Sequence, residues 1–547
     1  MTNYTRTPER ELPLNPRLPL LGIPNQRGQE PQQDSRLVNG YAEQGLDGRW
    51  HVFKRPGLTQ VFQPPAADAT GLGFWKAALA SFPVSFWSIG GALKLYQGSN
   101  LLYNAGATAS PTHFNFTSAY NGAVTLADIA TDGERTFLML ATGSVKELQP
   151  EGTALVLSCT TTNTSAVVTT ASTALLRKYS QISGTGIPAD TEIASIDNAT
   201  TFTMTNPATA SGAANLTFSL AGPPTQAVAA VASLNRSAYM ISAFSEINGT
   251  DVDDLTAWDP LNSIYAYAKA ESAVGIAGQL STIVAFKRNS TEFFRDQGTT
   301  PTPLGRVEGL FLDVGLQDVN SLIEIDDTLI WSASQKSGQR SVWSMTKLGA
   351  KEVSNPAIRR ILSEHRDDSQ KAMAFSYGGH TLYVLAIADI PALVYDLTSG
   401  LWYYWTALGE PDWPFVDAAT GNSGTVYLQH RSNGYIYQLD PEQYDDDGHL
   451  IDMDIYPPEF DGGTRKGKYL TRMFINGDQV EGSELKLRVS DDNQLSWTDY
   501  RRFDLGHSRP VLEHCGTFTK RFFHFRHSTR HPCQLHEVEL EMQVGVL

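Results

Sequence analysis

Histidine and cysteine side chains, which bind transition metals well, gather near the C-terminal end of the sequence. Zinc sites usually draw on such side chains at short paired spacings, for example two cysteines separated by two residues. The spacings here do not match that pattern, and arginine residues interrupt the set. His524 and His527 are an odd number of positions apart, so on a strand they would point to opposite faces. We therefore expect solvated or interface histidines and no metal site. The set comprises His514, Cys515, His524, His527, His531, Cys533 and His536.

An acidic run offers oxygen ligands of the kind that calcium prefers, namely Asp445, Asp447, Asp452 and Asp454. An EF-hand loop needs acidic or amide side chains at fixed steps before a glycine and a closing glutamate, and the residues around Gly448 do not supply them. We expect a solvated acidic turn at a domain boundary. The sequence also lacks a phosphate-binding loop, a nucleophile elbow and a paired-histidine zinc motif. The motifs of this sequence give no indication of catalytic chemistry or of a bound cofactor, and we expect no enzyme activity and no cofactor.

The stretch Ser490–Trp497 resembles the Asp-box hairpin of sialidase-type propellers. In such a hairpin the aspartate, here Asp492, caps backbone amides of the turn, and the tryptophan, here Trp497, packs beneath it. Gln494 stands where the motif has glycine and Ser496 where it has threonine, and the motif occurs once. The hairpin is structural in those families. Glycoside hydrolysis would need two carboxylates that converge in space, and no spacing in the sequence marks such a pair.

The elements that must position these residues are short strands. Between residues 275 and 405, runs rich in Val, Tyr and Trp alternate with turns of Gly, Ser, Asn or Asp. Leu329–Ser334 and Ser341–Met345 flank a turn that contains Gly338, and Val394–Leu397 and Leu401–Trp405 flank a tighter one, which predicts two hairpins. Hairpins at this spacing favour a β-propeller, a ring of four-stranded sheets. One helix is expected near residues 353–363, with Pro356 in its first turn.

The chain divides into five predicted parts. Residues 1–70 form an extended, proline-rich N-terminal arm followed by docking strands, and residues 71–150 form the first part of the propeller. Residues 151–222 are rich in Thr, Ser and Ala with regular apolar alternation, which predicts an inserted small β-sandwich-like domain; a disordered linker is the alternative. Residues 223–445 carry the main blades. Residues 446–547 form a C-terminal β unit that completes the propeller or forms a platform. The fold class is thus all-β.

Composition narrows the function further. The 547 residues carry a formal net charge of −16, so strong binding to DNA through counterion release is not expected. An acidic wall would suit a channel through which DNA slides with weak contacts, but charge that only keeps the protein soluble is the favoured explanation of the composition. The most apolar stretch, residues 74–93, is interrupted by Lys76, Pro83 and two glycines, so we expect buried strands and no membrane segment. The N-terminal residues show no signal-peptide pattern.

Several short motifs, taken in their order along the chain, resemble the packaged-DNA stabilisation family, the tail hub or nozzle proteins of short-tailed bacteriophages. The first covers Arg36 to Glu43 and includes Asn39 and Tyr41; the second is Arg55-Pro56-Gly57-Leu58. The order continues through Ser290–Phe294, Asp296–Gly298, Asp326–Leu329, Tyr377–Leu385, Tyr395-Asp396 and Gly400–Trp402, and ends with the Ser490–Trp497 hairpin. The inserted segment is a departure from the family pattern.

The resemblance implies a virion protein without catalytic residues. It implies a hexameric ring below the portal and adaptor rings that closes the DNA channel, retains the genome and passes it during ejection. The implied partners are copies of the chain, portal and adaptor proteins, a tail fibre or needle, and viral DNA in transient non-specific contact. The implied location is the phage tail, assembled in the host cytoplasm. Arg36, Asn39, Tyr41, Arg55, Pro56, Gly57, Asp492 and Trp497 are the predicted structural or docking residues.

Two alternatives remain open at this stage. The Asp-box-like hairpin and the many aromatic residues are compatible with a carbohydrate-binding or depolymerising tail propeller. The second alternative is a propeller that serves only in adhesion or scaffolding. Trp331, Trp343, Trp402 and Trp405 are interpreted as residues that pack between blades, because they alternate with apolar residues inside predicted strands.

Overall fold

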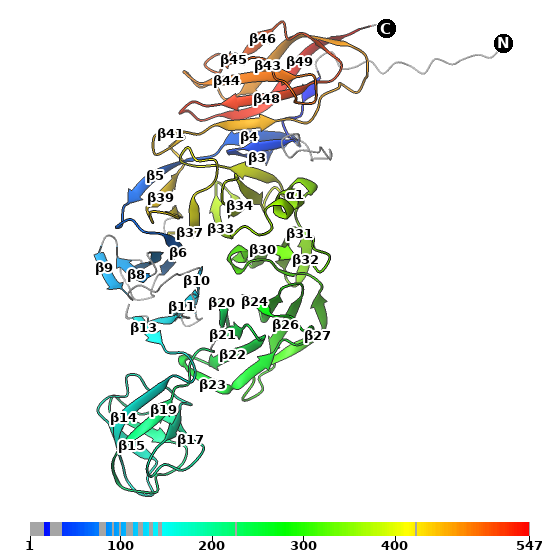
Figure 1. The fold of residues 1–547 in the computed structure, drawn as a ribbon. Helices are drawn as coiled ribbons and strands as arrows, with labels where there is room; N and C mark the ends of the chain where they lie inside the picture. The colour runs from blue at the N-terminus through cyan, green and yellow to red at the C-terminus, as the bar shows by residue number, and fades with distance from the viewer. Residues whose placement is uncertain are drawn as a thin grey trace, which may run out of the picture.

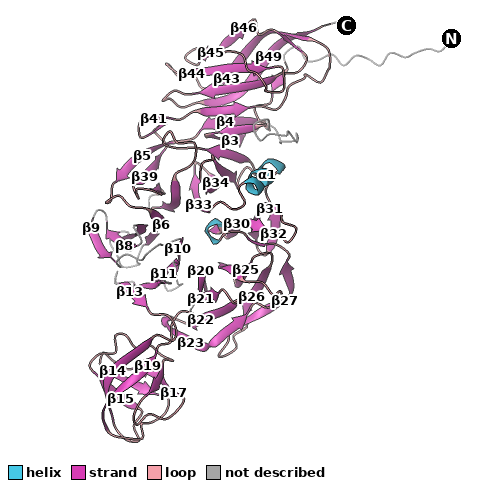
Figure 2. Cartoon of the chain, viewed as in Figure 1, coloured by secondary structure: helices cyan, strands magenta, loops and turns pink. Residues whose placement is uncertain are grey.

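The structure of the protein is a computed structural model that describes residues 16–21, 35–46, 48–75, 84–89, 92–97, 100–104, 113–118, 124–130, 135–140, 145–224, 227–421 and 424–545. Strands account for nearly all of its regular structure (Figure 2). Three regions follow one another along its long axis: a small barrel at one end, a ring of sheets in the middle and a two-sheet unit at the other end (Figure 1).

Seven sheets, built mainly from antiparallel strands, form the middle region in the described part of the chain. The first four are β6–β9 (Ala69–Trp75, Val84–Ile89, Ala92–Gln97, Asn100–Asn104), β10–β13 (His113–Ser118, Val124–Ala130, Arg135–Leu140, Val145–Leu148), β20–β23 (Ala227–Leu234, Ser237–Ser242, Glu246–Asp251, Asp254–Tyr265) and β24–β27 (Ala273–Gln279, Thr282–Lys287, Thr291–Asp296, Leu304–Leu312). The fifth holds β28 (Gly315–Leu316), β29 (Ile323–Ile325), β30 (Thr328–Ser334), β31 (Arg340–Thr346) and β32 (Gly349–Glu352). The sixth begins with β33–β36 (Gln370–Tyr377, His380–Ile387, Ala392–Asp396, Trp402–Trp405).

The seventh sheet joins the two ends of the ring. Its strands β37 (Phe415–Thr420), β38 (Val426–His430) and β39 (Ile436–Asp440) are extended by β5 (Gly57–Phe62), which comes from the N-terminal part of the chain. The first strands of neighbouring sheets contact one another around the centre, with β6 against both β37 and β10, and β20 against both β10 and β24. This radial arrangement is a β-propeller, and β5 closes it by pairing two distant segments (Figure 1).

The hairpins predicted from turn chemistry are present. β30 pairs with β31, with Trp331 opposite Trp343, and β35 pairs with β36. Trp331 and Trp405 are fully buried, and the Trp331 ring packs at 5.2 Å from that of Phe286 in the neighbouring sheet. The interpretation of these two tryptophans as residues that pack between blades is therefore confirmed.

The inserted segment is a closed barrel of strands β14 (Ala154–Thr161), β15 (Val167–Thr170), β16 (Gln181–Ser183), β17 (Thr191–Ile196), β18 (Thr201–Met204) and β19 (Gly212–Ser219). The predicted β domain is thus present, with its sheet closed on itself where a sandwich-like unit was expected. Apolar residues alternate inward along its strands around Val168, Phe202 and Phe218. Lys178 and Tyr179 both bind Asp251 of β22, which attaches the barrel to the propeller.

The C-terminal unit consists of two sheets. One contains β3 (Gly40–Gln44), β4 (Trp50–Lys54), β49 (Gln534–Val544), β43 (Lys468–Gly477) and β46 (Val511–Glu513), with β1 (Arg17–Leu18) on β49 and β47 (Thr517–Phe518) on β43. The other contains β2 (Arg36–Val38), β42 (Met453–Tyr456), β48 (Phe522–His527), β44 (Glu484–Ser490) and β45 (Arg501–Asp504). The described N-terminal strands therefore dock within their own chain.

The two-sheet unit and the propeller share one hydrophobic core. β2 lies between β36 of the sixth propeller sheet and β42, so a single sheet runs from one region into the other. The buried residues of this core extend from Met373 and Trp405 in the propeller to Leu487 and Leu540 in the C-terminal unit. Such continuity favours a rigid connection, because separating the two regions would expose apolar surface.

The predicted helix is α1 (Pro356–Glu364), and the short helix η2 covers Val319–Ser321. Asn355 caps α1, because its side-chain oxygen accepts the amide of Ile358 at 2.9 Å. Pro356 occupies the first turn, where its missing N–H costs no helical hydrogen bond.

Candidate functional site

The six predicted docking residues of the N-terminal segment all lie at the junction between the propeller and the C-terminal unit. Arg36 is in β2, Tyr41 is in β3, and Asn39 stands between these strands. Arg55, Pro56 and Gly57 form the passage from β4, in the C-terminal unit, to β5, in the propeller. The sequence indicated these residues only because their motifs follow the order seen in the resembling family. The structure places them at one junction.

A buried ion pair is the centre of this junction. Arg55 and Asp446 are 1% and 2% exposed, and two hydrogen bonds of 2.9 and 2.5 Å join the guanidinium to the carboxylate. Arg55 also donates to the backbone oxygens of Pro56 and Thr406, at 2.9 and 2.7 Å. The carboxylate of Asp446 accepts the amide of Leu408 at 3.1 Å. Nearly every polar atom of the pair is therefore used, which a buried charge requires.

Asp446 corrects one prediction from the sequence. The acidic run was expected to be a solvated turn at a boundary, yet Asp446 is buried and β40 (Asp445–Asp446) pairs with β5 in the seventh propeller sheet, followed by β41 (His449–Leu450). The run is not a passive linker, because one of its carboxylates neutralises Arg55. Only tertiary structure could reveal this, since 391 positions separate the two residues.

Asn39 and Gly57 have backbone positions that few other residues would tolerate. Asn39 has a φ of 53°, in the left-handed region that asparagine adopts more readily than most residues. Its side-chain amide donates to Thr406 and to the backbone oxygen of Asp452, both at 2.9 Å. A Cβ atom on Gly57 would lie 2.1 Å from the backbone oxygen of Asp445. Glycine is therefore needed where β5 and β40 approach each other.

Tyr41 packs against a second polar cluster, formed by His380, Asp396 and Glu43. Its ring stacks on Phe53 at 5.2 Å and contacts the ring of His380 at 5.0 Å. His380 Nδ1 lies 2.7 Å from the carboxylate of Asp396, and its Nε2 lies 3.4 Å from that of Glu43 in β3. The hydrogen bond to Asp396 raises the pKa of His380, and the same imidazole lowers the pKa of Asp396 against the opposing effect of burial. Burial raises the pKa of Tyr41.

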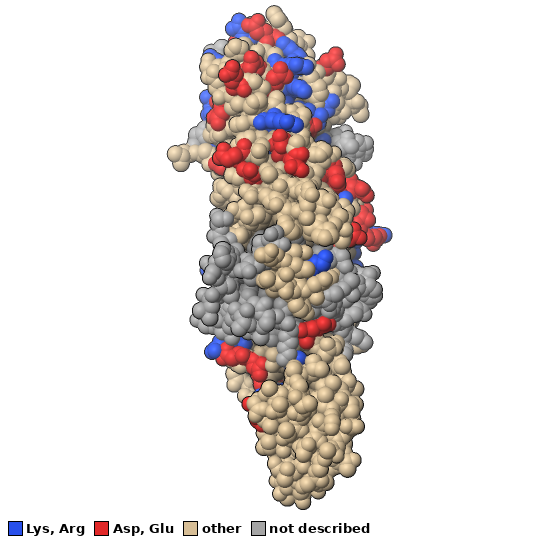
Figure 3. All heavy atoms as spheres, turned by 90° about the vertical axis from the view of Figure 1, so that its left-hand side faces the viewer, with Lys and Arg blue, Asp and Glu red and all other residues tan. Residues whose placement is uncertain are grey.

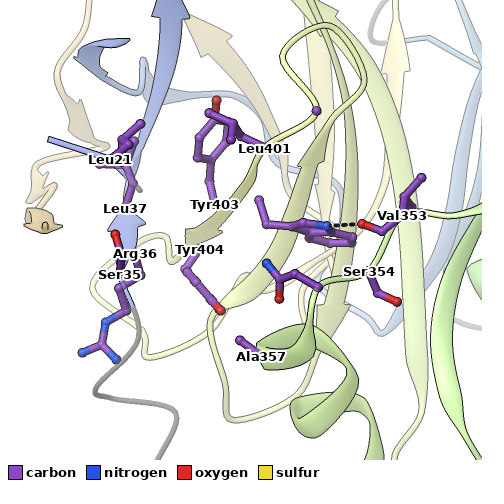
Figure 4. A pocket seen from close by; sticks show the side chains of 13 residues that line it. Leu21, Ser35, Arg36, Leu37, Val353, Ser354, Ala357, Leu401, Tyr403 and Tyr404 are labelled. Atoms are coloured by element: carbon purple, nitrogen blue, oxygen red, sulfur yellow. Dashed lines mark hydrogen bonds between the residues drawn. The ribbon is translucent and has the colours of Figure 1, made fainter. Parts of the chain in front are cut away.

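Two cavities open at this junction. One, of about 410 Å³, lies beside His380 and is lined by Ala42, Glu43, Gln44, Trp50, Gly378, Gly379, Thr398 and Ser399. The other, of about 190 Å³, lies where β2 and β36 diverge beyond their single paired position, and Figure 4 shows its lining residues. Trp402 donates its indole N–H to the backbone oxygen of Val353 across that cavity at 2.9 Å. The guanidinium of Arg36 points away from the other labelled side chains and lies 4.2 Å from the ring of Tyr456.

Asp492 and Trp497 lie apart from this junction, in the loop between β44 and β45. The Asp492 carboxylate accepts the hydroxyl of Ser490 at 2.8 Å, and the hydroxyl and amide of Ser496 at 2.5 and 3.0 Å. These hydrogen bonds lower the pKa of Asp492 to about 2. The expected local chemistry of the Asp-box-like turn is therefore present, and Trp497 stands beside Arg488, with the guanidinium 4.9 Å from its ring.

The prediction of solvated or interface histidines is wrong for His524 and His527, because both are fully buried. His524 binds Asp454 at 2.7 Å through Nε2, and His527 binds Ser483 at 2.8 Å. Burial lowers the pKa of both, to about 3 for His527. His527 lies on the face of β48 that carries Phe523 and Phe525 into the core, whereas His524 lies on the outer face, where the rings of Tyr456, Trp497 and Tyr500 cover it. In the described ranges, no group of three His, Cys, Asp or Glu side chains is placed to hold a metal ion.

No sequence motif indicated two titratable residues on the contacting propeller strands β37 and β33, namely Asp417 and Lys371. Asp417 of β37 accepts the backbone amides of Leu72 and Ala418, at 3.0 and 2.8 Å, and burial raises its pKa to about 7. Lys371 of β33 donates to Asn320 at 2.7 Å, and burial lowers its pKa to about 8. Asp417 lies in β37, for which no strand was predicted, so no local signal marked it. No helix among the described residues is long and apolar enough to span a membrane.

Part of the chain resembles a known protein family. Residues 189–444 match the protein family described as "Bacteriophage P22 Gp10, beta-propeller", from within the barrel to the seventh propeller sheet. No curated protein matches the chain. Similar solved structures include the computationally designed Ika8 protein, with 12% identity, TM-score 0.34 and coverage of 70% of this chain and 99% of that chain. Others are BBS1N in complex with ARL6DN (10% identity, TM-score 0.35, coverage 70% and 97%) and the Mitotic Checkpoint Complex (7%, 0.37, 71% and 96%).

The all-strand fold and the family match together define a β-propeller structural protein of a bacteriophage tail, a component of the virion. Residues 189–444, within the propeller and part of the barrel, match the packaged-DNA stabilisation protein family of short-tailed bacteriophages. The junction built around Arg55 and Asp446 holds the propeller to its C-terminal unit, and the inserted barrel lies at the opposite end of the molecule (Figure 1).

Proposed function

We propose that the protein forms the nozzle of a short non-contractile tail, a hexameric ring below the portal and adaptor that closes the DNA channel, retains the packaged genome and passes it during ejection. The observation that carries the proposal is the family match over residues 189–444, which include propeller strands β20 to β39. The partners proposed with it are copies of the chain, the portal and adaptor proteins, a tail fibre or needle, and viral DNA in transient contact. Assembly in the host cytoplasm is part of the same proposal.

The rigid connection between the propeller and the C-terminal unit supports a role in which the subunit resists the pressure of packaged DNA. A ring that retains pressurised DNA needs subunits whose regions do not move apart. Here one sheet and one hydrophobic core run from the propeller into the C-terminal unit, and a buried ion pair lies between them. The closure of the propeller by β5 ties the N-terminal segment into the same body. These features favour rigid subunits, because opening any of them exposes apolar surface or an unpaired charge.

The charge of the chain supports passage of DNA without strong retention on the wall. The net charge of −16 disfavours a large release of counterions, which is the main source of non-specific DNA affinity. DNA would therefore slide past such a surface more readily than past a basic one. In the view of Figure 3, charged side chains of both signs cover the C-terminal unit, whereas the barrel surface is almost free of them.

Electron microscopy of the purified protein, alone and mixed with portal–adaptor complexes, tests the proposal. Six-fold rings, or particles bound at the adaptor, are the expected result. A stable monomer that binds neither itself nor the adaptor would refute the nozzle role. The barrel-deleted chain, in which a short Gly/Ser linker joins residues 150 and 223, is a useful companion, because the ring should form without the insert if the propeller and the C-terminal unit make the subunit contacts.

We also propose that the protein has no enzyme activity. The competing function, a carbohydrate-binding or depolymerising tail propeller, predicts the release of reducing sugar from host capsule or lipopolysaccharide, or retention on a glycan array. The buried positions of Trp331 and Trp405 leave these rings unavailable as a sugar platform. Release of sugar by the purified chain would overturn the proposal in favour of that alternative, and glycan binding alone would favour an adhesion propeller.

A further inference from the structure

A row of planar side chains crosses the outer face of the sheet formed by β2, β42, β48 and β44. The guanidinium of Arg36 lies over Tyr456, whose ring stacks on that of His524 at 4.1 Å with an interplanar angle of 7°. Arg488 lies opposite His524 in the next strand. The row therefore ends at Arg488, beside the Asp492 turn.

Arg488 is held in a fixed orientation. Its guanidinium lies 4.9 Å from the ring of Trp497 and 5.0 Å from the ring of Tyr500. Its Nε donates to Nδ1 of His524 at 2.7 Å, and Nε2 of the same imidazole binds Asp454. Two aromatic rings and one hydrogen bond thus position the guanidinium. Its two terminal nitrogens make no hydrogen bond to the described residues and can bind another partner.

The positive charge of Arg488 is not neutralised by an ion pair in the described part of the chain, although neighbouring cations are. Arg526 binds Asp454 through two hydrogen bonds of 2.6 and 2.8 Å, and Arg502 lies 3.4 Å from Glu484. The guanidinium of Arg488 is half-buried and carries its charge without a carboxylate partner among the described residues. Such a preorganised fork is suited to bind a carboxylate or a phosphate.

Lys486 provides a second cation on the same face. Residues two apart on a strand point the same way, about 7 Å from each other, and the burial of Leu485 and Leu487 confirms that Lys486 and Arg488 both face outward. An extended peptide has the same spacing between alternate side chains. The two cations therefore match two acidic residues at alternate positions of one extended segment.

We propose that Arg488 and Lys486 form a docking site for an extended acidic segment of a partner protein, whose alternate carboxylates bind the two cations. This deepens the proposed function, because such a partner would be a neighbour in the virion, but the site can be tested on the isolated chain. DNA fits the site less well. Asp454 ends the row formed by Arg526, Lys486 and Arg502, and Glu484 lies two residues before Lys486 on β44. These carboxylates interrupt a continuous path of phosphates, and strong DNA binding needs many phosphate contacts.

Fluorescence anisotropy with a labelled peptide in which Glu alternates with Thr tests the proposal at low ionic strength. The same peptide with Gln for Glu, and a labelled DNA duplex, are the comparison probes. The Glu peptide should bind and the Gln peptide should not. Arg488→Gln should weaken binding by at least about tenfold, since a hydrogen-bonded charge pair of ~1.5 kcal/mol or more is lost. Arg488→Lys should lose most of that affinity too, because lysine lacks the planar fork.

Matched variants keep the test independent of folding. Arg472→Gln removes an exposed arginine of the other sheet, which pairs with Glu513, and should leave binding unchanged. Lys486→Gln removes the second cation without disturbing the aromatic stack and should weaken binding as well. Equal binding of the Glu and Gln peptides, equal losses in Arg472→Gln and Arg488→Gln, or tighter binding of DNA than of the Glu peptide through Arg488 would each overturn the proposal. Six-fold rings seen by microscopy would support the nozzle role regardless of this result.

Discussion

Replacement of Asp446 by asparagine should strongly destabilise the connection between the propeller and the C-terminal unit. The substitution removes the negative charge from a pair that is 1% and 2% exposed, and leaves the Arg55 guanidinium buried without a counter-charge. Removal of one partner of a buried ion pair costs about 3–5 kcal/mol, mostly from the stranded charge. The hydrogen bonds of Arg55 to Pro56 and Thr406 remain, so we expect a loss toward the lower part of that range.

Urea unfolding monitored by tryptophan fluorescence measures this loss, because Trp413 lies beside Arg55, 5.5 Å from its guanidinium. Hydrogen exchange of the β5 and β40 amides reports whether opening begins at the junction. Arg530→Gln is the matched control, since Arg530 is 59% exposed and pairs with the neighbouring Asp445 at 3.3 Å. An exposed pair contributes only about 0–1 kcal/mol. Equal effects of Asp446→Asn and Arg530→Gln would refute the reasoning.

A second test uses the double variant Arg55→Met, Asp446→Leu. If the cost of each single change comes from an unpaired buried charge, removal of both charges should recover much of the stability that either single substitution loses. A double variant as unstable as the sum of the two single variants would show that packing and backbone hydrogen bonds, and not the charge pair, hold the junction together.

Three further outcomes are expected. Asp417→Asn should raise the unfolding free energy by about 2–4 kcal/mol above pH 7 and change it little below pH 4, because a pKa raised from 3.8 to about 7 in the folded state makes wild-type stability fall as pH rises through that interval. Urea titrations near pH 4 and near pH 8 check this, and equal gains at both would contradict it. Gly57→Ala should cost about 1–3 kcal/mol by overpacking, since a Cβ there would lie 2.1 Å from a backbone oxygen of Asp445, whereas Gly467→Ala meets nothing within 4 Å and serves as the control in thermal unfolding. Asp492→Ala should accelerate hydrogen exchange of the Ser496 amide, which donates to the Asp492 carboxylate, with little change in the midpoint of global unfolding. Unchanged exchange would show that the turn is stable without the carboxylate.

Local sequence rules predicted the repeated hairpins, the helix with Pro356 in its first turn and the inserted β domain. These features depend on residues close together in the chain, such as the alternation of apolar positions in β30 and β31 or the proline and cap of α1. The same rules failed for His524 and His527. Their types and spacing suggest exposure, but whether other side chains cover them depends on segments far along the chain, such as Tyr456 and Trp497 over His524.

The boundaries of the regions were also beyond local rules. Strands from residues 36–62 enter three different sheets: β2 joins the sixth propeller sheet to the C-terminal unit, β3 and β4 extend the other C-terminal sheet, and β5 completes the seventh propeller sheet. A strand's sequence specifies that it will pair and which face is apolar, but it does not specify the partner. Long-range pairing therefore decides whether residues 446–547 complete the propeller or form a separate unit. Most of their strands form the two sheets of the C-terminal unit.

The sequence by itself determined an all-β chain with turn-rich repeats, an acidic character and a rigid Arg55-Pro56-Gly57 turn. These properties come from composition and from contacts over a few residues. Only the tertiary structure decided that this turn is the junction of two regions, that Asp446 neutralises Arg55, and that Arg488 stands clamped between two aromatic rings without an ion-pair partner in the described part of the chain. The physical reason is that burial and pairing free energies depend on which distant segments meet, and local propensity carries no information about that meeting.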